Sequence, residues 1–93
     1  MSYQIIWDTQ SKDFLKKLEN KEAQRIIKKV NSISVNPMRY LDTLVQIDAY
    51  KLRVGDYRIL IDLDNEHKFM NIVFIGHRKN IYKYIDKPGK FQK

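Results

Sequence analysis

Apolar and polar residues alternate on both sides of a Gly-Asp pair, and this pattern constrains the fold more than any other feature. Residues 50–61 read Tyr-Lys-Leu-Arg-Val-Gly-Asp-Tyr-Arg-Ile-Leu-Ile, with Gly55-Asp56 as a two-residue turn signal. The pattern predicts an antiparallel hairpin in which Arg53 lies directly opposite Arg58. Because strand side chains alternate between faces, Lys51, Arg53 and Arg58 share one face, and apolar side chains dominate the other.

The predicted hairpin therefore sets two arginines against each other. Like charges that lie directly opposite one another destabilise a sheet. A hairpin that is otherwise built like a core element, yet places Arg53 against Arg58, is expected to bind an anion on that face.

The chain as a whole is also strongly basic. Eighteen Lys and Arg residues against eleven Asp and Glu residues give a formal net charge of +7, and the isoelectric point is about 9.7. A charge of this size points to nucleic acid, anionic lipid or an acidic protein as the partner. The plainer alternative is a basic protein with no such partner.

Length and composition limit the classes of protein further. Ninety-three residues, 43% of them hydrophobic, predict one small globular domain that spans 1–93. The sequence has no cysteine, which excludes a disulfide framework and thiolate chemistry. It shows no signal peptide at its start and no apolar run long enough to span a membrane. We therefore expect a cytoplasmic protein with no membrane partner.

The order of expected elements is β-α-α-β-β-β with a short helix at the C-terminal end. Strands are expected at 3–7, 49–54, 57–63 and 69–75, and helices at 11–18, 22–36 and 78–85. Residues 38–48 are expected to form a loop or short turn. The predicted fold class is α+β, with the two N-terminal helices packed on a four-stranded, mainly antiparallel sheet. Candidate core residues are Trp7, Phe14, Met38, Met70 and Phe74.

This order brings distant residues together at the tip of the hairpin. Strand 57–63 runs away from the tip and strand 69–75 returns antiparallel to it, so the segment 76–78 is expected near Arg58. Arg78, and Tyr82 one helical turn later, would join the hairpin cations there. The two N-terminal helices are expected to cover the apolar face, which leaves the cationic face open as a shallow groove.

The C-terminal segment adds further candidates for contacts with a nucleic acid. Lys79 and Lys83 belong to a run of basic residues that begins at Arg78, and His77 lies next to the expected site. Tyr57 and Tyr82 are aromatic side chains that could stack on an unpaired base. We expect these residues to line the groove as binding residues.

No grouping of side chains in the sequence suggests a metal or a cofactor. The segment Asp62-x-Asp64-x-Glu66 has alternate carboxylates but lacks the glycine and the distal glutamate of a calcium loop, and is expected to be a turn. His67 in that turn is expected to be exposed and inert. There is no Gly-rich phosphate loop.

Two motifs carry a resemblance to a known family. Arg-x-Gly-x-Tyr-Arg at 53–58 is followed, after a strand, by Gly-His-Arg-x-x-x-Tyr at 76–82. Together with the order of elements, these motifs resemble the RelE/ParE superfamily of toxins from type II toxin–antitoxin pairs. The resemblance covers nearly the whole chain, from Tyr3 to about Ile85, and implies a single toxin domain with two N-terminal helices on an antiparallel sheet.

The RelE branch of this superfamily implies a metal-independent endoribonuclease that cuts messenger RNA in the ribosomal A site. The reaction implied is attack of a ribose 2′-hydroxyl on the adjacent phosphate. By position, the resemblance makes Arg58 the arginine that stabilises the phosphoryl group and Arg78 the arginine near the leaving group. Tyr82 matches an active-site tyrosine, and Lys51 matches one of two active-site lysines. The second lysine falls at Ala49 here, which leaves the general base unassigned.

The remaining implications concern partners and alternatives. Arg53 matches a basic residue of the groove that holds RNA. The resemblance implies neutralisation by a cognate acidic, RelB-like antitoxin, together with contacts to ribosomal RNA. A ParE-like poison of DNA gyrase, which is not an enzyme, is the first alternative, although that branch generally lacks the arginine and tyrosine set. A catalytically inactive RNA-binding relative is the second.

Overall fold

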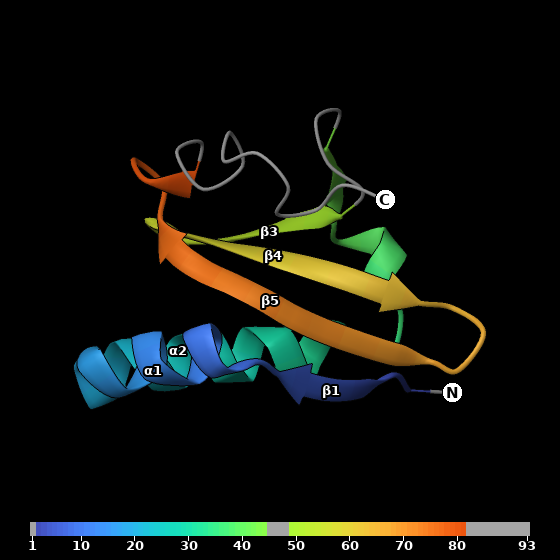
Figure 1. Cartoon of the computed structure of the whole chain (residues 1–93), viewed down its shortest axis with the longest axis horizontal. Coiled ribbons are helices and arrows are strands. Elements are labelled where there is room, and N and C mark those ends of the chain that lie inside the picture. The colour runs from blue at the N-terminus through green and yellow to red at the C-terminus, as the bar shows by residue number, and fades with distance from the viewer. Residues whose placement is uncertain (1, 45–48, 82–93) are drawn as a thin grey trace.

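A computed structural model describes residues 2–44 and 49–81, and in it a layer of two helices packs against one face of a five-stranded sheet (Figure 1). The helices are α1 (Thr9–Lys17) and α2 (Asn20–Ile33), followed by a short 3₁₀ helix, η1 (Pro37–Arg39). The strands are β1 (Gln4–Trp7), β2 (Asp42–Thr43), β3 (Tyr50–Val54), β4 (Tyr57–Asp64) and β5 (Phe69–His77).

The sheet confirms the α+β class and the mainly antiparallel arrangement. Its strand order is β1-β5-β4-β3-β2, in which β1 pairs with β5 in parallel and every other pair is antiparallel. The predicted hairpin register is confirmed, with Arg53 paired to Arg58 across β3 and β4. Strand β5 is an interior strand of the sheet, because it lies between β1 and β4.

The prediction of four strands was wrong by one. Asp42 and Thr43 form the additional strand β2, which pairs with Lys51 and Tyr50 at the edge of the sheet. A strand of two residues is too short to show an alternating pattern, so periodicity could not separate it from the expected loop at 38–48.

The N-terminal end of α1 is fastened to β5 by polar side chains. Asp8 is the N-cap of the helix, and its carboxylate accepts a hydrogen bond from the Ser11 backbone at 2.8 Å. The buried Ser11 hydroxyl donates to the Ile72 carbonyl, while the Gln10 amide both donates to and accepts from the Ile75 backbone at 3.1 Å. The pairing of β1 with β5 ends at Ile72. Further along β5, the Gln10 side chain makes the backbone hydrogen bonds that a neighbouring strand would otherwise make.

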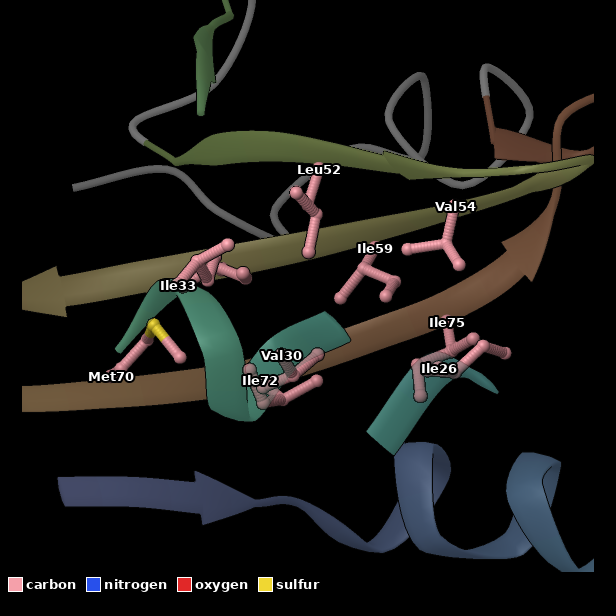
Figure 2. Close-up of a cluster of buried hydrophobic side chains, with 10 residues drawn as sticks. Ile26, Val30, Ile33, Leu52, Val54, Ile59, Met70, Ile72 and Ile75 are labelled. Atoms are coloured by element: carbon pink, nitrogen blue, oxygen red, sulfur yellow. The ribbon is translucent and has the colours of Figure 1, made fainter. Parts of the chain in front are cut away.

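The main core lies between α2 and the sheet. Ile26, Val30 and Ile33 recur at helical spacing on α2 and are fully buried against the apolar face of the hairpin and of β5 (Figure 2). Trp7 and Phe14 pack at its margin as partly buried residues. The members of this core that are buried are Ile26, Val30, Ile33, Leu52, Val54, Ile59, Ile61, Met70, Ile72 and Ile75. The expectation that Met38 is a core residue was wrong, since it is 49% exposed on η1, outside the periodic part of the helix.

A second, smaller core lies on the opposite face of the sheet. Leu60, Phe74 and Ile81 are buried there, with Leu44 and Val73 packed against them. Phe74 lies opposite Leu60, and the pairing of β4 with β5 shifts register directly after this pair, where Ile61 pairs with Ile72. A Cβ atom at Gly76 would lie 2.6 Å from the Phe74 ring, so the ring occupies the space above the glycine.

The chain beyond β5 is described only as far as Ile81. The expectation that a helix begins at Arg78 was wrong, because residues 78–80 form a turn. Ile81 is helical, and residues 82–85 of the expected helix lie outside the described residues. Within 2–44 and 49–81, neither α1 nor α2 has the length and apolar character needed to cross a membrane.

We predict that Gln10→Ala lowers the free energy of unfolding by about 1–3 kcal/mol, because it leaves the buried Ile75 N–H and C=O without their partners. Urea denaturation of the two proteins measures this loss. Gln24→Ala is the matched control, since Gln24 is exposed on α2 and makes no such bonds. Equal midpoints for wild type and Gln10→Ala would contradict the anchoring role.

We predict that Gly76→Ala destabilises the fold by about 1–3 kcal/mol, since the new methyl group would overlap the Phe74 ring. The same substitution in a Phe74→Leu background should cost less, by at least about 0.5 kcal/mol, because the smaller side chain gives way. A double-mutant cycle by chemical denaturation measures the coupling. Additive effects would show that the contact with the ring is not the cause.

Candidate active site

The tip of the β3–β4 hairpin is a tight two-residue turn whose backbone conformation depends on its first residue, Gly55. Gly55 has φ +58°, whereas Asp56 does not have a positive φ, as in a type II′ turn with glycine first. The Arg25 guanidinium of α2 lies over Gly55, 2.9 Å from where a Cβ atom would stand. The backbone conformation and this close approach both favour glycine at position 55.

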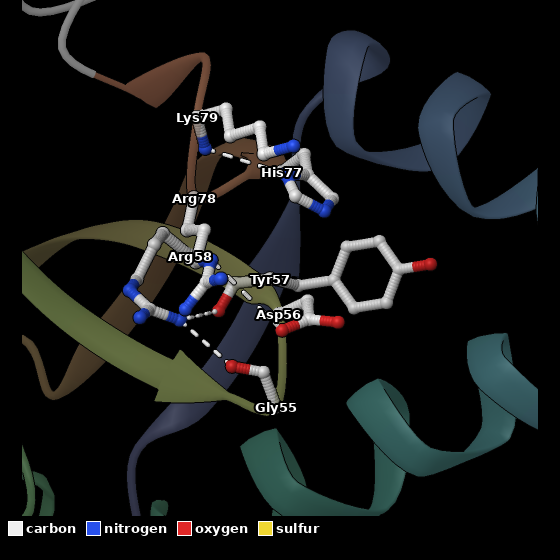
Figure 3. A network of polar contacts seen from close by, with 7 residues as sticks. All are labelled: Gly55, Asp56, Tyr57, Arg58, His77, Arg78 and Lys79. Carbon is white, nitrogen blue, oxygen red and sulfur yellow. Dashed lines mark hydrogen bonds and ion pairs between the residues drawn. The ribbon is translucent and has the colours of Figure 1, made fainter.

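Arg58 is held at this tip by main-chain carbonyls. Its Nη1 donates hydrogen bonds to the carbonyl oxygens of Gly55 and Tyr57, both at 2.9 Å (Figure 3). These bonds draw the guanidinium toward the turn. A guanidinium has five N–H donors, so donors remain for a ligand.

Arg78 reaches the same tip from the end of β5. Its backbone N–H donates to the Asp56 carbonyl at 2.8 Å, and its Nε lies 4.0 Å from the Asp56 carboxylate. Figure 3 shows the side chains of Arg58 and Arg78 on the same side of the hairpin. The expectation that the end of this strand lies near Arg58 is confirmed, since Gly76 is its pairing partner.

The cations gather around an open pocket of about 390 Å³ on the face away from the helices. We call it the cationic pocket. Its lining is Lys51, Arg53, Arg58, Arg78, Lys79 and Ile81. No carboxylate is among these residues, and the buried Ile81 packs on the second core beneath. The pocket therefore concentrates positive charge on an apolar floor, which strengthens electrostatic contacts with an anion.

Tyr57 and His77, expected as groove residues, lie on the other face of the sheet. The Tyr57 ring contacts Phe14 of α1 edge-on at 6.0 Å between centroids, and His77 contacts Tyr57 at 6.2 Å. Figure 3 shows both rings pointing away from Arg58 and Arg78. Neither residue lines the cationic pocket. The Nδ1 atom of His77 instead accepts a hydrogen bond from the Lys79 backbone at 3.3 Å.

Two of the expected site residues, Tyr82 and Lys83, lie outside the described residues, and their roles stay predictions. Ala49, to which the resemblance gives the position of a second active-site lysine, is 4% exposed. The residue is therefore packed among neighbours, in a place where a lysine would have to bury its stem.

Sequence reasoning missed two contributors to the site. Asp56 was expected only as a turn residue, yet its carbonyl and carboxylate both face Arg78. The apolar floor at Ile81, which packs with Phe74 in the second core, was missed as well. The available signal is the continuous apolar run at 69–75, which is typical of a strand buried on both faces. Such a run does not say what lies above the second face.

The turn between β4 and β5 spans residues 65–68 and does not line the cationic pocket. The expectation of a turn at 62–66 was partly wrong, because Asp62 and Asp64 are the last part of β4 and only Glu66 lies in the turn. His67 is exposed, and its ring lies 2.9 Å from the Asp64 carboxylate. The backbone N–H of His67, and then its ring, hold the pKa of Asp64 below its ordinary value. Among residues 2–44 and 49–81, no group of three His, Cys, Asp or Glu side chains is placed to hold a metal ion.

The arrangement in the cationic pocket suits a phosphate group. Arg58 and Arg78 offer planar guanidinium groups from two sides, and guanidinium matches phosphate oxygens in a bidentate way. Lys51 and Lys79 add point charges at the rim. Such a set can bind a phosphodiester and can stabilise additional negative charge that develops on it during a reaction.

The fold is shared with solved structures of RelE toxins and of toxin–antitoxin complexes. The chain is similar to a chain of the toxin–antitoxin complex RelBE2 from Mycobacterium tuberculosis, at 25% identity and TM-score 0.76, covering 84% of this chain and 100% of that one. An archaeal RelE–RelB complex from Pyrococcus horikoshii matches at 21% identity and TM-score 0.69, with 84% and 97% covered. A mutant of the E. coli toxin RelE in the free state matches at 20% identity and TM-score 0.72, with 90% and 92% covered.

A comparison of the sequence with curated proteins finds no match. The family model described as the ParE toxin of type II toxin–antitoxin systems matches residues 5–82, which contain every described element of the fold except the start of β1. The chain therefore belongs to the RelE/ParE superfamily of toxins from type II toxin–antitoxin systems.

Proposed function

We propose that this toxin is a ribosome-dependent endoribonuclease that cuts messenger RNA in the A site. The observation that supports this most is the cationic pocket, an open space that Arg58 and Arg78 line together. No carboxylate lines it, although the Asp56 carboxylate lies 4.0 Å from the Arg78 Nε. The reaction would be attack of a ribose 2′-hydroxyl on the adjacent phosphorus, with loss of the 5′-oxygen of the next nucleotide. This gives a 2′,3′-cyclic phosphate and a free 5′-hydroxyl, and needs no metal.

Each cation that lines the pocket has a role in this scheme. Arg58, held by the carbonyls of the turn, would stabilise the charge that develops on the phosphoryl oxygens. Arg78 would stabilise the leaving oxygen from the end of β5. Lys51 and Tyr82 are the candidates for moving the protons, and Arg53 and Lys79 would bind adjacent phosphates.

The ribosome enters the proposal because the pocket is open. A shallow surface with few contacts binds RNA but does not by itself hold a 2′-hydroxyl in line with the phosphorus. The ribosomal A site would supply that orientation. The mRNA and the surrounding ribosomal RNA are thus the proposed partners in the cell.

An antitoxin is the second proposed partner. The solved relatives include complexes with RelB antitoxins. Because this chain carries a net charge of +7, we propose an acidic, partly disordered antitoxin that folds as it binds. Covering the cationic pocket would neutralise the toxin.

One observation favours a different activity. The matching family model is that of ParE toxins. Toxins of this branch of the superfamily are not enzymes, and they act by poisoning DNA gyrase. In that case the cations would bind an acidic surface or DNA, and no RNA would be cut. The two activities differ in their products, which makes them separable.

We predict that Arg58→Ala lowers the rate of mRNA cleavage about 100-fold or more, because it removes a donor aimed at the developing charge. Primer extension on a translated mRNA with purified ribosomes measures the cuts. Arg58→Lys should restore only part of the rate, since an ammonium group lacks the planar pair of donors.

Arg39→Ala is the control for this experiment, because Arg39 is an exposed arginine on η1 that does not line the pocket. Cleavage at wild-type rates by Arg58→Ala would contradict the assigned role. If wild-type protein cuts no mRNA and DNA breaks accumulate with gyrase, the ParE-like activity is correct instead.

A further inference from the structure

A second basic pocket lies between α2 and the edge of the hairpin. It is about 510 Å³ in volume, and we call it the helix–strand pocket. Its lining is Arg25, Lys28 and Lys29 from α2, with Arg53, Val54 and Gly55 from the hairpin. Nothing in the family resemblance or in the proposed reaction uses the three residues of α2.

These three cations of α2 are close neighbours, and few acidic side chains lie near enough to neutralise their charge. Residues three and four apart share a helix face, so Arg25, Lys28 and Lys29 lie together, and like charges at this spacing destabilise a helix. Among the described residues, the only carboxylate within ion-pair distance of them is Glu22, which is 4.0 Å from Arg25. The Lys29 ammonium lies 5.5 Å from the centroid of the exposed Tyr40 ring.

Arg53 joins this pocket to the cationic pocket, because it lines both. The reason is its place in the sheet. β2 pairs only with Tyr50 and Lys51, so within the described chain β3 is the edge of the sheet from Leu52 onward. A long side chain at position 53 can therefore reach over the edge, and a ligand can pass around it from one pocket to the other.

We propose that the helix–strand pocket binds phosphodiester groups of RNA, and that these belong to the same strand whose scissile phosphate lies in the cationic pocket. This rests on the proposed function. The strand would cross the edge of β3 at Arg53 and continue over Lys28 and Lys29.

The lining of the pocket favours RNA over an acidic protein. Protein interfaces are depleted in lysine at their centre and need buried apolar anchors, whereas the apolar member here, Val54, is already 95% removed from solvent by the core (5% exposed). Lys and Arg beside an exposed aromatic ring, as at Lys29 and Tyr40, are typical of surfaces that bind single strands.

The test measures binding to RNA that cannot be cut, because its ribose at the scissile position is 2′-O-methylated. Two probes are compared by fluorescence anisotropy over a series of salt concentrations: a trinucleotide, which fills only the cationic pocket, and a dodecanucleotide. The double variant Lys28→Ala/Lys29→Ala should bind the dodecanucleotide about 25-fold more weakly at about 0.1 M salt, with the salt slope reduced by about 1.4, for two lost phosphate contacts. Its affinity for the trinucleotide should match that of wild type.

Lys12→Ala/Lys16→Ala is the matched control, since both residues are exposed on α1, four apart, and remove the same charge. It should leave the salt slope for both probes unchanged. Equal losses by the two double variants, or equal losses for the two probes, would show a general effect of net charge and overturn the proposal.

Two further outcomes identify other occupants. If the helix variant binds both oligonucleotides normally but binds ribosomes more weakly, the phosphates come from ribosomal RNA, and the single-strand path is wrong. If it loses affinity only for an acidic peptide such as oligoglutamate, the pocket is a protein site and the proposal is wrong. Because no probe is cleaved, these results do not depend on the Arg58→Ala experiment. If Lys28→Ala/Lys29→Ala weakens binding of the dodecanucleotide while the wild-type protein cuts no mRNA in the primer-extension experiment, the proposed nuclease activity is wrong but the helix–strand pocket is still an RNA-binding site.

Discussion

The antiparallel pairing of β4 with β5 is the interaction on which the rest of this structure depends. It places Gly76 opposite Arg58 and so brings Arg78 to the hairpin tip from a distant part of the sequence. The bonds of Gln10 and Ser11 to β5 hold that strand on its other side, where β1 has ended. The helices therefore act on the site indirectly, by fixing the strand that carries one of its two arginines.

The structure reduces the electrostatic repulsion between the two opposed arginines of the hairpin. Arg53 and Arg58 are paired across β3 and β4, as the alternation predicts. The Arg58 guanidinium turns to the carbonyls of Gly55 and Tyr57, while Arg53 extends toward the edge and lines two pockets. Separation of the two charges, and partial neutralisation of one by carbonyl dipoles, lower the repulsion without an acidic partner.

The sequence was sufficient to predict the helices and strands with a clear hydrophobic periodicity, but it predicted the arrangement of the site less well. The Gly55-Asp56 turn and the alternation around it specify the register, because a slip of one residue would turn the apolar face to solvent. The face of Tyr57 was predictable from the same alternation, yet this residue was expected in the groove as an aromatic side chain that could stack on a base. The face of His77 was not predictable in this way, because the register shift between β4 and β5 reverses the alternation along β5. The contacts of Asp56 with Arg78, and of Phe74 with Gly76, depend on how separate strands meet, which periodicity within one strand does not report.

The turn at the hairpin tip holds both arginines through its main chain, since the carbonyls of Gly55 and Asp56 are the acceptors. The length of this loop therefore matters more than the chemistry of the Asp56 side chain. Removing or adding one residue would rotate the following strand by half a repeat and carry Arg58 to the helix-facing side. Natural variation in such a toxin should change the side chain at position 56 freely and keep glycine at position 55, while insertions and deletions at the tip are removed by selection.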